Sequence, residues 1–197
     1  MFILLPVSLA LDFSAFLKIG VALVGITYCV WVMIKLKLLS KKKLTQIDFK
    51  NNWKRLIITF IVIALASTLF LYFVHPENLF IVVKKRPMLW IGILLIYTFL
   101  SAVPQELIYR SFFFERYHDI FSKPYYLIWA NILVFPIAHL FFDNMMVLVV
   151  TFIGGMIFTA SYYRTKSVFF TSIEHALYGN WLFTIGMGEM LAFPMPS

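Results

Sequence analysis

The sequence has few charged residues: they make up 13% of its 197 positions, whereas 62% are hydrophobic and 19% are aromatic. A soluble domain of this length needs more polar side chains to cover its surface. The apolar residues also form long unbroken runs, without the alternation that a membrane β-barrel requires. Composition therefore predicts an all-α fold, a polytopic transmembrane helix bundle.

Cysteine is almost absent, since Cys29 is the single one. One thiol excludes an internal disulfide and a cysteine-rich metal site. It lies in an apolar stretch, where we expect a small buried residue rather than a nucleophile. The segment Met1–Ala10 is apolar too, but it lacks the basic start and the cleavage site of a secretory signal. We expect it to be a surface or partial membrane segment.

Acidic residues are scarce as well, nine against 17 basic ones, which gives a net charge of +8. Eight basic residues lie in one segment between two apolar runs: Lys35, Lys37, Lys41, Lys42, Lys43, Lys50, Lys54 and Arg55. Such a segment is typical of a cytoplasmic loop that contacts anionic head groups. The predicted partner is thus the lipid bilayer, with no nucleic acid.

About six segments approach the roughly 20 residues that a membrane span needs. They are Phe16–Ile34, Leu56–Val74, Met88–Val103, Tyr125–Phe142, Met145–Tyr162 and Val168–Ile185. The third is expected to continue past Pro104. Without repeats or soluble appendages, the chain is interpreted as one domain, 1–197, and we expect it in the cell (plasma or inner) membrane.

The basic loops predict an orientation. The loop before Arg55, the loop with Arg116 and Lys123, and the turn at Arg164 would all be cytoplasmic, with both termini outside. The cluster at 84–86 (Lys-Lys-Arg) falls on the other side. Either an interfacial segment near Leu79–Val83 changes the count, or the rule is broken locally.

Four ionisable residues lie in or beside these spans: Glu106, Arg110, His139 and His175. Ionisable groups are expensive in hydrocarbon and usually face a bundle interior or a wet cavity. We therefore expect a buried polar site. Glu106 and Arg110 are four residues apart, so they share a helix face and can pair. The alternatives are an ion pair that only fixes helix packing and histidines that are only packing residues.

Glu106, His139 and His175 together have the chemistry to activate a water molecule. Two histidines and a carboxylate can also bind zinc, so zinc and no cofactor both stay open. Asn180 could donate to an oxyanion or serve as a packing amide. Glu174 lies about 100° around the helix from its neighbour His175, so it need not face the same cavity. It could be an auxiliary carboxylate or a partner for a basic group on another helix.

Three motifs resemble those of the CAAX prenyl protease and bacteriocin-processing family, intramembrane endopeptidases also called abortive-infection proteins. They are Gln-Glu-x-x-x-Arg at 105–110, Phe-x-x-x-His at 135–139, and Glu-His-Ala-Leu-Tyr-Gly-Asn at 174–180, within a similar core of about 88–188. The resemblance implies hydrolysis of a peptide bond, at or within the membrane, in a membrane-associated peptide or protein.

The same resemblance implies a role for each matched residue. Glu106 and His139 would activate the water, while His175 and Asn180 would stabilise the oxyanion. Arg110 would hold the helix that carries the glutamate in register.

The sequence departs from the family pattern twice. Gln105 replaces the first glutamate of a Glu-Glu pair, and glutamine cannot accept a proton as a general base. Gly179 stands four residues after His175, where the family commonly has its asparagine. The alternative function is therefore an inactive family member that acts as a membrane binding or chaperone-like module. A proton-relay transporter is disfavoured, because the chain lacks paired repeats.

Overall fold

The computed structural model describes residues 1–37 and 49–191, and within these ranges the chain is helical with no strand. The basic residues Lys41, Lys42 and Lys43 lie outside the described residues. The chain forms two compact units. Unit 1 comprises residues 1–46 and 107–168, and unit 2 comprises residues 47–106 and 169–197. The expectation of a single domain stays a prediction.

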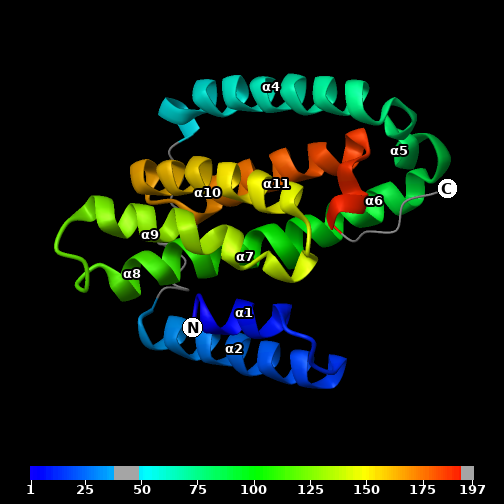
Figure 1. Cartoon of the computed structure of the whole chain (residues 1–197). Coiled ribbons are helices and arrows are strands. Elements are labelled where there is room, and N and C mark those ends of the chain that lie inside the picture. The colour runs from blue at the N-terminus through cyan, green and yellow to red at the C-terminus, as the bar shows by residue number, and fades with distance from the viewer. Residues whose placement is uncertain (38–48, 192–197) are drawn as a thin grey trace. The chain divides into compact units, whose positions relative to one another are not determined.

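The described residues of unit 1 form five α-helices and two other helical segments (Figure 1). The α-helices are α1 (Leu4–Ala10), α2 (Ala15–Lys35), α8 (Phe113–Tyr117), α9 (Pro124–Ile137) and α10 (Met145–Thr165). The others are the π-helical segment η3 (Leu107–Phe112) and the 3-10 turn η4 (Leu140–Phe142).

Local sequence signals explain where α9 and α10 begin. Pro124 occupies the first turn of α9, and the Asn144 side chain accepts the Met146 amide at 2.9 Å to cap α10.

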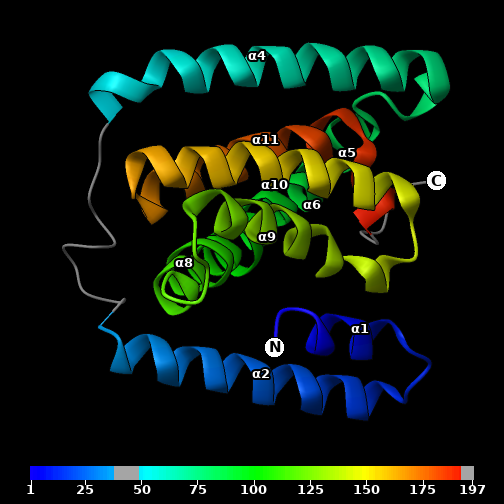
Figure 2. The same cartoon turned by 60° about the vertical axis from the view of Figure 1, so that its left-hand side comes forward.

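Helices pack in pairs inside unit 1: α1 lies against α2, and α9 lies against α10 (Figures 1 and 2). Gly155 permits the second contact. A Cβ atom at this position would lie 3.1 Å from the carbonyl oxygen of Ile132 and 3.4 Å from the Cβ of Phe135. A glycine thus lets the α9 and α10 backbones approach closely, as small residues do in membrane bundles.

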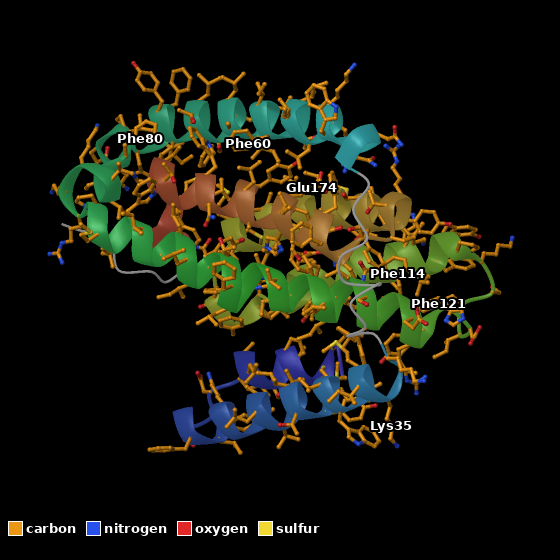
Figure 3. All side chains as sticks on the ribbon, turned by 180° about the vertical axis from the view of Figure 1, so that it is seen from behind. Lys35, Phe60, Phe80, Phe114, Phe121 and Glu174 are labelled. Atoms are coloured by element: carbon orange, nitrogen blue, oxygen red, sulfur yellow. The ribbon has the colours of Figure 1, made fainter. Side chains whose placement is uncertain are left out.

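The largest apolar cluster of unit 1 lies at one end of its helices. Phe2 is ringed by four aromatic side chains of η3 and α8, at centroid distances of 5.1–6.0 Å: Tyr109, Phe112, Phe113 and Tyr117. The C-terminal parts of α2 and α10 join this cluster through Met33 and Tyr162. Figure 3 shows Lys35, Phe114 and Phe121 at this same end. Lys35, at the start of the predicted basic loop, thus lies at this end of the unit, and the orientation stays a prediction.

Unit 2 contains four α-helices: α4 (Phe49–Val74), α5 (Ile81–Lys85), α6 (Pro87–Ile96) and α11 (Val168–Ile185). Its shorter segments are η1 (Pro76–Asn78), the π-helical η2 (Tyr97–Ala102), α7 (Val103–Glu106) and η5 (Met187–Leu191). The five residues of α5 reach about 7.5 Å, far less than a bilayer, so this segment adds no span. An interfacial segment and a local break of the rule therefore both stay open for the basic cluster at 84–86.

The end of α11 is fastened to the turn before α5. The Phe80 amide donates to the carbonyl of Ile185 at 2.9 Å. Gly186 follows with φ +114°, a conformation that favours glycine, and a Cβ there would overlap the Asn78 carbonyl. On α6, the indole N–H of Trp90 donates to the Thr184 hydroxyl at 3.0 Å. These contacts fix the C-terminal half of α11 within unit 2.

Five helical stretches are long and apolar enough to cross a membrane: Phe16–Lys35, Asn51–Val74, Pro87–Tyr117, Pro124–Phe142 and Met145–Thr165. They confirm five of the predicted spans, including the continuation past Pro104. The sixth prediction coincides with α11, Val168–Ile185, which is not among these five. Its polar residues, Glu174, His175 and Asn180, lower its hydropathy. The all-α membrane fold and a buried polar site are confirmed.

The close approach at Gly155 generates a stability prediction. Gly155→Ala should lower the thermal unfolding temperature of the purified protein in detergent, because the new methyl group meets the Ile132 backbone. Gly92→Ala on α6 is the matched control, since nothing lies within 4 Å of its new Cβ. That control should be neutral or stabilising by up to about 1 kcal/mol. Equal effects of the two changes would contradict the close packing.

Candidate functional site

Glu106 ends α7, between the π-helical segments η2 and η3. The Val103 amide donates to the carbonyl of Thr98, five residues back, as a π-helix requires. Pro104 has no amide hydrogen, so the regular α-helical bond to residue 100 is lost in any case. Single π-helical turns inside α-helices are frequent at functional sites. The backbone around Glu106 therefore departs from the regular helix that the sequence spacing assumed.

The Glu106 carboxylate binds His175 of α11 within unit 2. Its Oε1 lies 2.8 Å from the Nδ1 of His175. Glu106 has no exposed surface, and His175 is 5% exposed. An ionised Glu106 carboxylate can only accept, and in that state Nδ1 of His175 donates the hydrogen bond. Two of the predicted site residues thus form a buried carboxylate–imidazole pair.

Gln105 and Asn180 each bind a hydroxyl of η2 in unit 2. The Gln105 amide donates to the Ser101 hydroxyl at 2.9 Å, and the Asn180 amide donates to the Thr98 hydroxyl at 3.0 Å. Among the described residues, Asn180 makes no hydrogen bond to Glu106 or His175. This geometry accounts for Asn180 as an amide that joins α11 to η2, and its predicted oxyanion role stays a prediction.

Glu174 faces α4 rather than Glu106. Its Oε1 accepts a bond from the Arg55 guanidinium at 2.8 Å and lies 3.3 Å from the Tyr178 hydroxyl. Phe60 of α4 stacks on Tyr178 beside this ion pair, with ring centroids 6.3 Å apart. Figure 3 shows Phe60 and Glu174 between the two helices. Of the two roles open to Glu174, auxiliary carboxylate or partner of a basic group on another helix, the structure favours the second.

Arg110 is fully buried in unit 1, where it binds a polar cluster. Its guanidinium donates to the Asn131 side-chain oxygen at 3.0 Å, and the Thr159 hydroxyl donates to the same atom at 2.8 Å. The Asn131 amide donates in turn to the carbonyl of Tyr109 in η3. The Phe135 ring covers the guanidinium, and its centroid lies 4.7 Å from the Cζ atom of Arg110. Arg110 thus holds η3 against α9 and α10.

His139 lies in unit 1, immediately after α9. Its Nδ1 is 2.9 Å from the carbonyl oxygen of Phe135, so this nitrogen donates and Nε2 is the basic one. Its ring stacks on Phe142, with centroids 6.1 Å apart. Because His139 belongs to unit 1 and the Glu106–His175 pair to unit 2, its joint action with that pair stays a prediction, as does pairing of Arg110 with Glu106.

The partners of Arg110 and Glu174 were not among the residues predicted from the sequence. Asn131 and Thr159 are polar residues within spans, and their position in apolar runs was an available signal. Arg55 gave no such signal, because it sits among other basic residues before a span. In the described part of the chain, no three His, Cys, Asp or Glu side chains are grouped to hold a metal ion. A zinc site stays a prediction.

Comparison with known families gives one match. Residues 87–181 match the family described as type II CAAX prenyl endopeptidase, Rce1-like. The match nearly coincides with the motif core of about 88–188 and includes all five predicted site residues. No curated protein and no solved structure matches the chain.

The cluster around Arg110 generates a second stability prediction. Asn131→Leu should destabilise the protein by about 1–3 kcal/mol, because Arg110 and the Tyr109 carbonyl lose a buried partner. Thr159→Val removes one bond between helices and should cost about 0.6 kcal/mol. Both are measured by thermal unfolding in detergent.

Thr151→Val is the matched control on α10, since the Thr151 hydroxyl bonds only to carbonyls of its own helix. If Asn131→Leu were no more destabilising than this control, the cluster would not stabilise the fold.

Proposed function

Since residues 87–181 match the Rce1-like family of type II CAAX prenyl endopeptidases, we propose that this protein is an intramembrane endopeptidase. It hydrolyses a peptide bond at or within the membrane, in a membrane-associated peptide or protein. The observation that carries this proposal is the buried bond between Glu106 and His175, inside the matched segment and among apolar helices.

The pair supplies a base for water, so this proposal makes His175 the base rather than the oxyanion donor that the family resemblance implies. The Glu106 carboxylate holds the Nδ1 proton of His175, which orients the ring and leaves Nε2 to accept a proton. As Nε2 takes that proton, the water oxygen bonds to the peptide carbon and the carbonyl electron pair moves onto oxygen. Collapse of this intermediate breaks the C–N bond, and Nε2–H returns the proton to the leaving amine. The carboxylate stabilises the imidazolium in between.

The family resemblance also implies roles for His139 and Arg110. The family resemblance assigns His139 to the attacking water, and Nε2 is the atom it would use, because Nδ1 faces Phe135. Arg110 acts through η3, the segment that directly follows Glu106. It is a positioning residue rather than one that contacts the substrate.

The substrate class follows from the family description and from the apolar setting. A C-terminally prenylated peptide is the first probe, because the matched family is described as acting on prenylated CAAX sequences. Any cleaved bond has to reach Nε2 of His175, a residue that is 5% exposed in this structure.

The proposed function predicts that cleavage depends on both Glu106 and His175. Glu106→Gln and His175→Ala, reconstituted in liposomes with a quenched farnesylated CAAX peptide, should each lose about 10²–10⁴-fold in kcat. Glu106→Gln keeps a hydrogen-bond acceptor but removes the charge that stabilises the imidazolium. His139→Ala tests the third predicted residue in the same assay.

Histidines outside the site provide matched controls. His75→Ala and His118→Ala change exposed side chains that pair only with neighbouring acidic residues, and both should keep full activity. A chelator in the same assay tests the zinc alternative. Wild-type rates in both Glu106→Gln and His175→Ala would refute the assignment.

The second candidate function is a membrane binding or chaperone-like module without protease activity. Gln105 favours it, because this residue cannot act as a base and its amide is bonded to Ser101. Under this alternative, the wild-type protein would not cleave the peptide and Gln105→Glu would create cleavage. Under the protease proposal, Gln105→Glu should leave the rate within about tenfold of wild type, because Glu106 already supplies the carboxylate.

A further inference from the structure

A tyrosine of η2 fills the space where α11 lacks a side chain. A Cβ atom at Gly179 would overlap the hydroxyl, Cε1 and Cζ atoms of Tyr97. Any residue larger than glycine at position 179 would therefore displace this ring. Tyr97 occupies the volume into which a side chain at residue 179 would project.

Position 179 lies one helical turn after His175, so both residues share a face of α11. Residue 183, a further turn on, completes the row. The Tyr97 ring lies across this row, edge to face with His175 at 5.8 Å and with Phe183 at 4.9 Å between centroids. Phe183 is buried, so its contact helps to fix the position of the ring. The hydroxyl thus comes from η2 to the same helix face as His175.

The Tyr97 hydroxyl makes no hydrogen bond to any residue within 1–37 or 49–191. Tyr97 is partly buried, so its hydroxyl is a donor that a substrate group beside the carboxylate–imidazole pair could use. Asn180 differs in this respect, because its amide already donates to Thr98. A neutral O–H is also the right kind of donor here, since it stabilises negative charge without adding a buried cation.

We propose that Tyr97 is a catalytic residue that donates its hydroxyl hydrogen bond to the substrate oxyanion. This inference rests on the proposed peptidase function. When water attacks the peptide carbon, the carbonyl oxygen gains the electron pair, and the Tyr97 O–H bonds to it without transferring its proton. On collapse, that pair reforms the carbonyl bond while the C–N bond breaks, so the hydroxyl is unchanged at the end of the cycle.

The test separates the hydroxyl from the ring. Tyr97→Phe keeps the contacts with His175 and Phe183 and should lower kcat by about 10²–10³-fold, with KM changed little. Tyr72→Phe on α4 is the matched control, since Tyr72 is exposed, and it should keep the wild-type kcat. A wild-type kcat in Tyr97→Phe would overturn the proposal and make Tyr97 a packing residue.

A second test of the proposal places a hydrogen-bond donor on α11 in place of the Tyr97 hydroxyl. Tyr97→Ala removes both ring and hydroxyl, and Tyr97→Ala combined with Gly179→Asn returns an amide donor to the vacated space. The double variant should be at least tenfold faster than Tyr97→Ala alone. Suppose that Tyr97→Ala and the double variant were equally slow while Tyr97→Phe remained fully active. Activity would then depend on the Tyr97 ring and not on its hydroxyl, and the proposal would fail.

Failure of this inference is distinguishable from failure of the proposed function. A phosphonate analogue of the peptide carries the oxyanion permanently, and its affinity can be measured by calorimetry without turnover. Tyr97→Phe should weaken phosphonate binding by about 10²-fold and leave binding of the uncleaved peptide unchanged. If Glu106→Gln abolished cleavage while Tyr97→Phe bound the phosphonate normally, only the Tyr97 proposal would be wrong. If the wild type neither cleaved the peptide nor preferred the phosphonate, both would be wrong.

Discussion

The contact between Glu106 and His175 is the constraint to which the surrounding helices of unit 2 conform. A carboxylate without exposed surface needs a donor close by, because burying an unpaired charge costs several kcal/mol. The imidazole 2.8 Å away meets that need, but only if the end of α7 stays against α11. The π-helical η2 before Glu106 and the absence of a side chain at Gly179, which admits Tyr97, both allow that approach.

The same rule governs the other buried polar groups. Arg55 and Glu174 join α4 to α11, and Arg110 joins η3 to α9 through Asn131. In apolar surroundings such bonds are worth little net stability, but breaking one leaves a buried charge without compensation. The polar residues therefore specify which helices meet within each unit, while the apolar side chains allow many partners. A site with a fixed geometry can form in an otherwise non-specific apolar bundle.

Much of the fold could be predicted from the sequence, because apolar runs of span length have few other uses. Glu106 and His175 could also be predicted, since ionisable residues in such runs are rare. The hydrogen-bond partners of the buried polar residues could not be predicted. Glu174 and His175 are neighbours in sequence, yet one binds Arg55 and the other Glu106, and this depends on how α11 is rotated. Tyr97 gave no signal, because an aromatic residue in an apolar run is ordinary and the hole at Gly179 exists only in three dimensions.

The most direct test of the central claim is peptide cleavage in ¹⁸O-labelled water, with wild type and Glu106→Gln reconstituted side by side and products weighed by mass spectrometry. A hydrolytic site built on Glu106 and His175 predicts one ¹⁸O atom in the new carboxylate from the wild type and almost no product from Glu106→Gln. Equal amounts of labelled product from both proteins would contradict it.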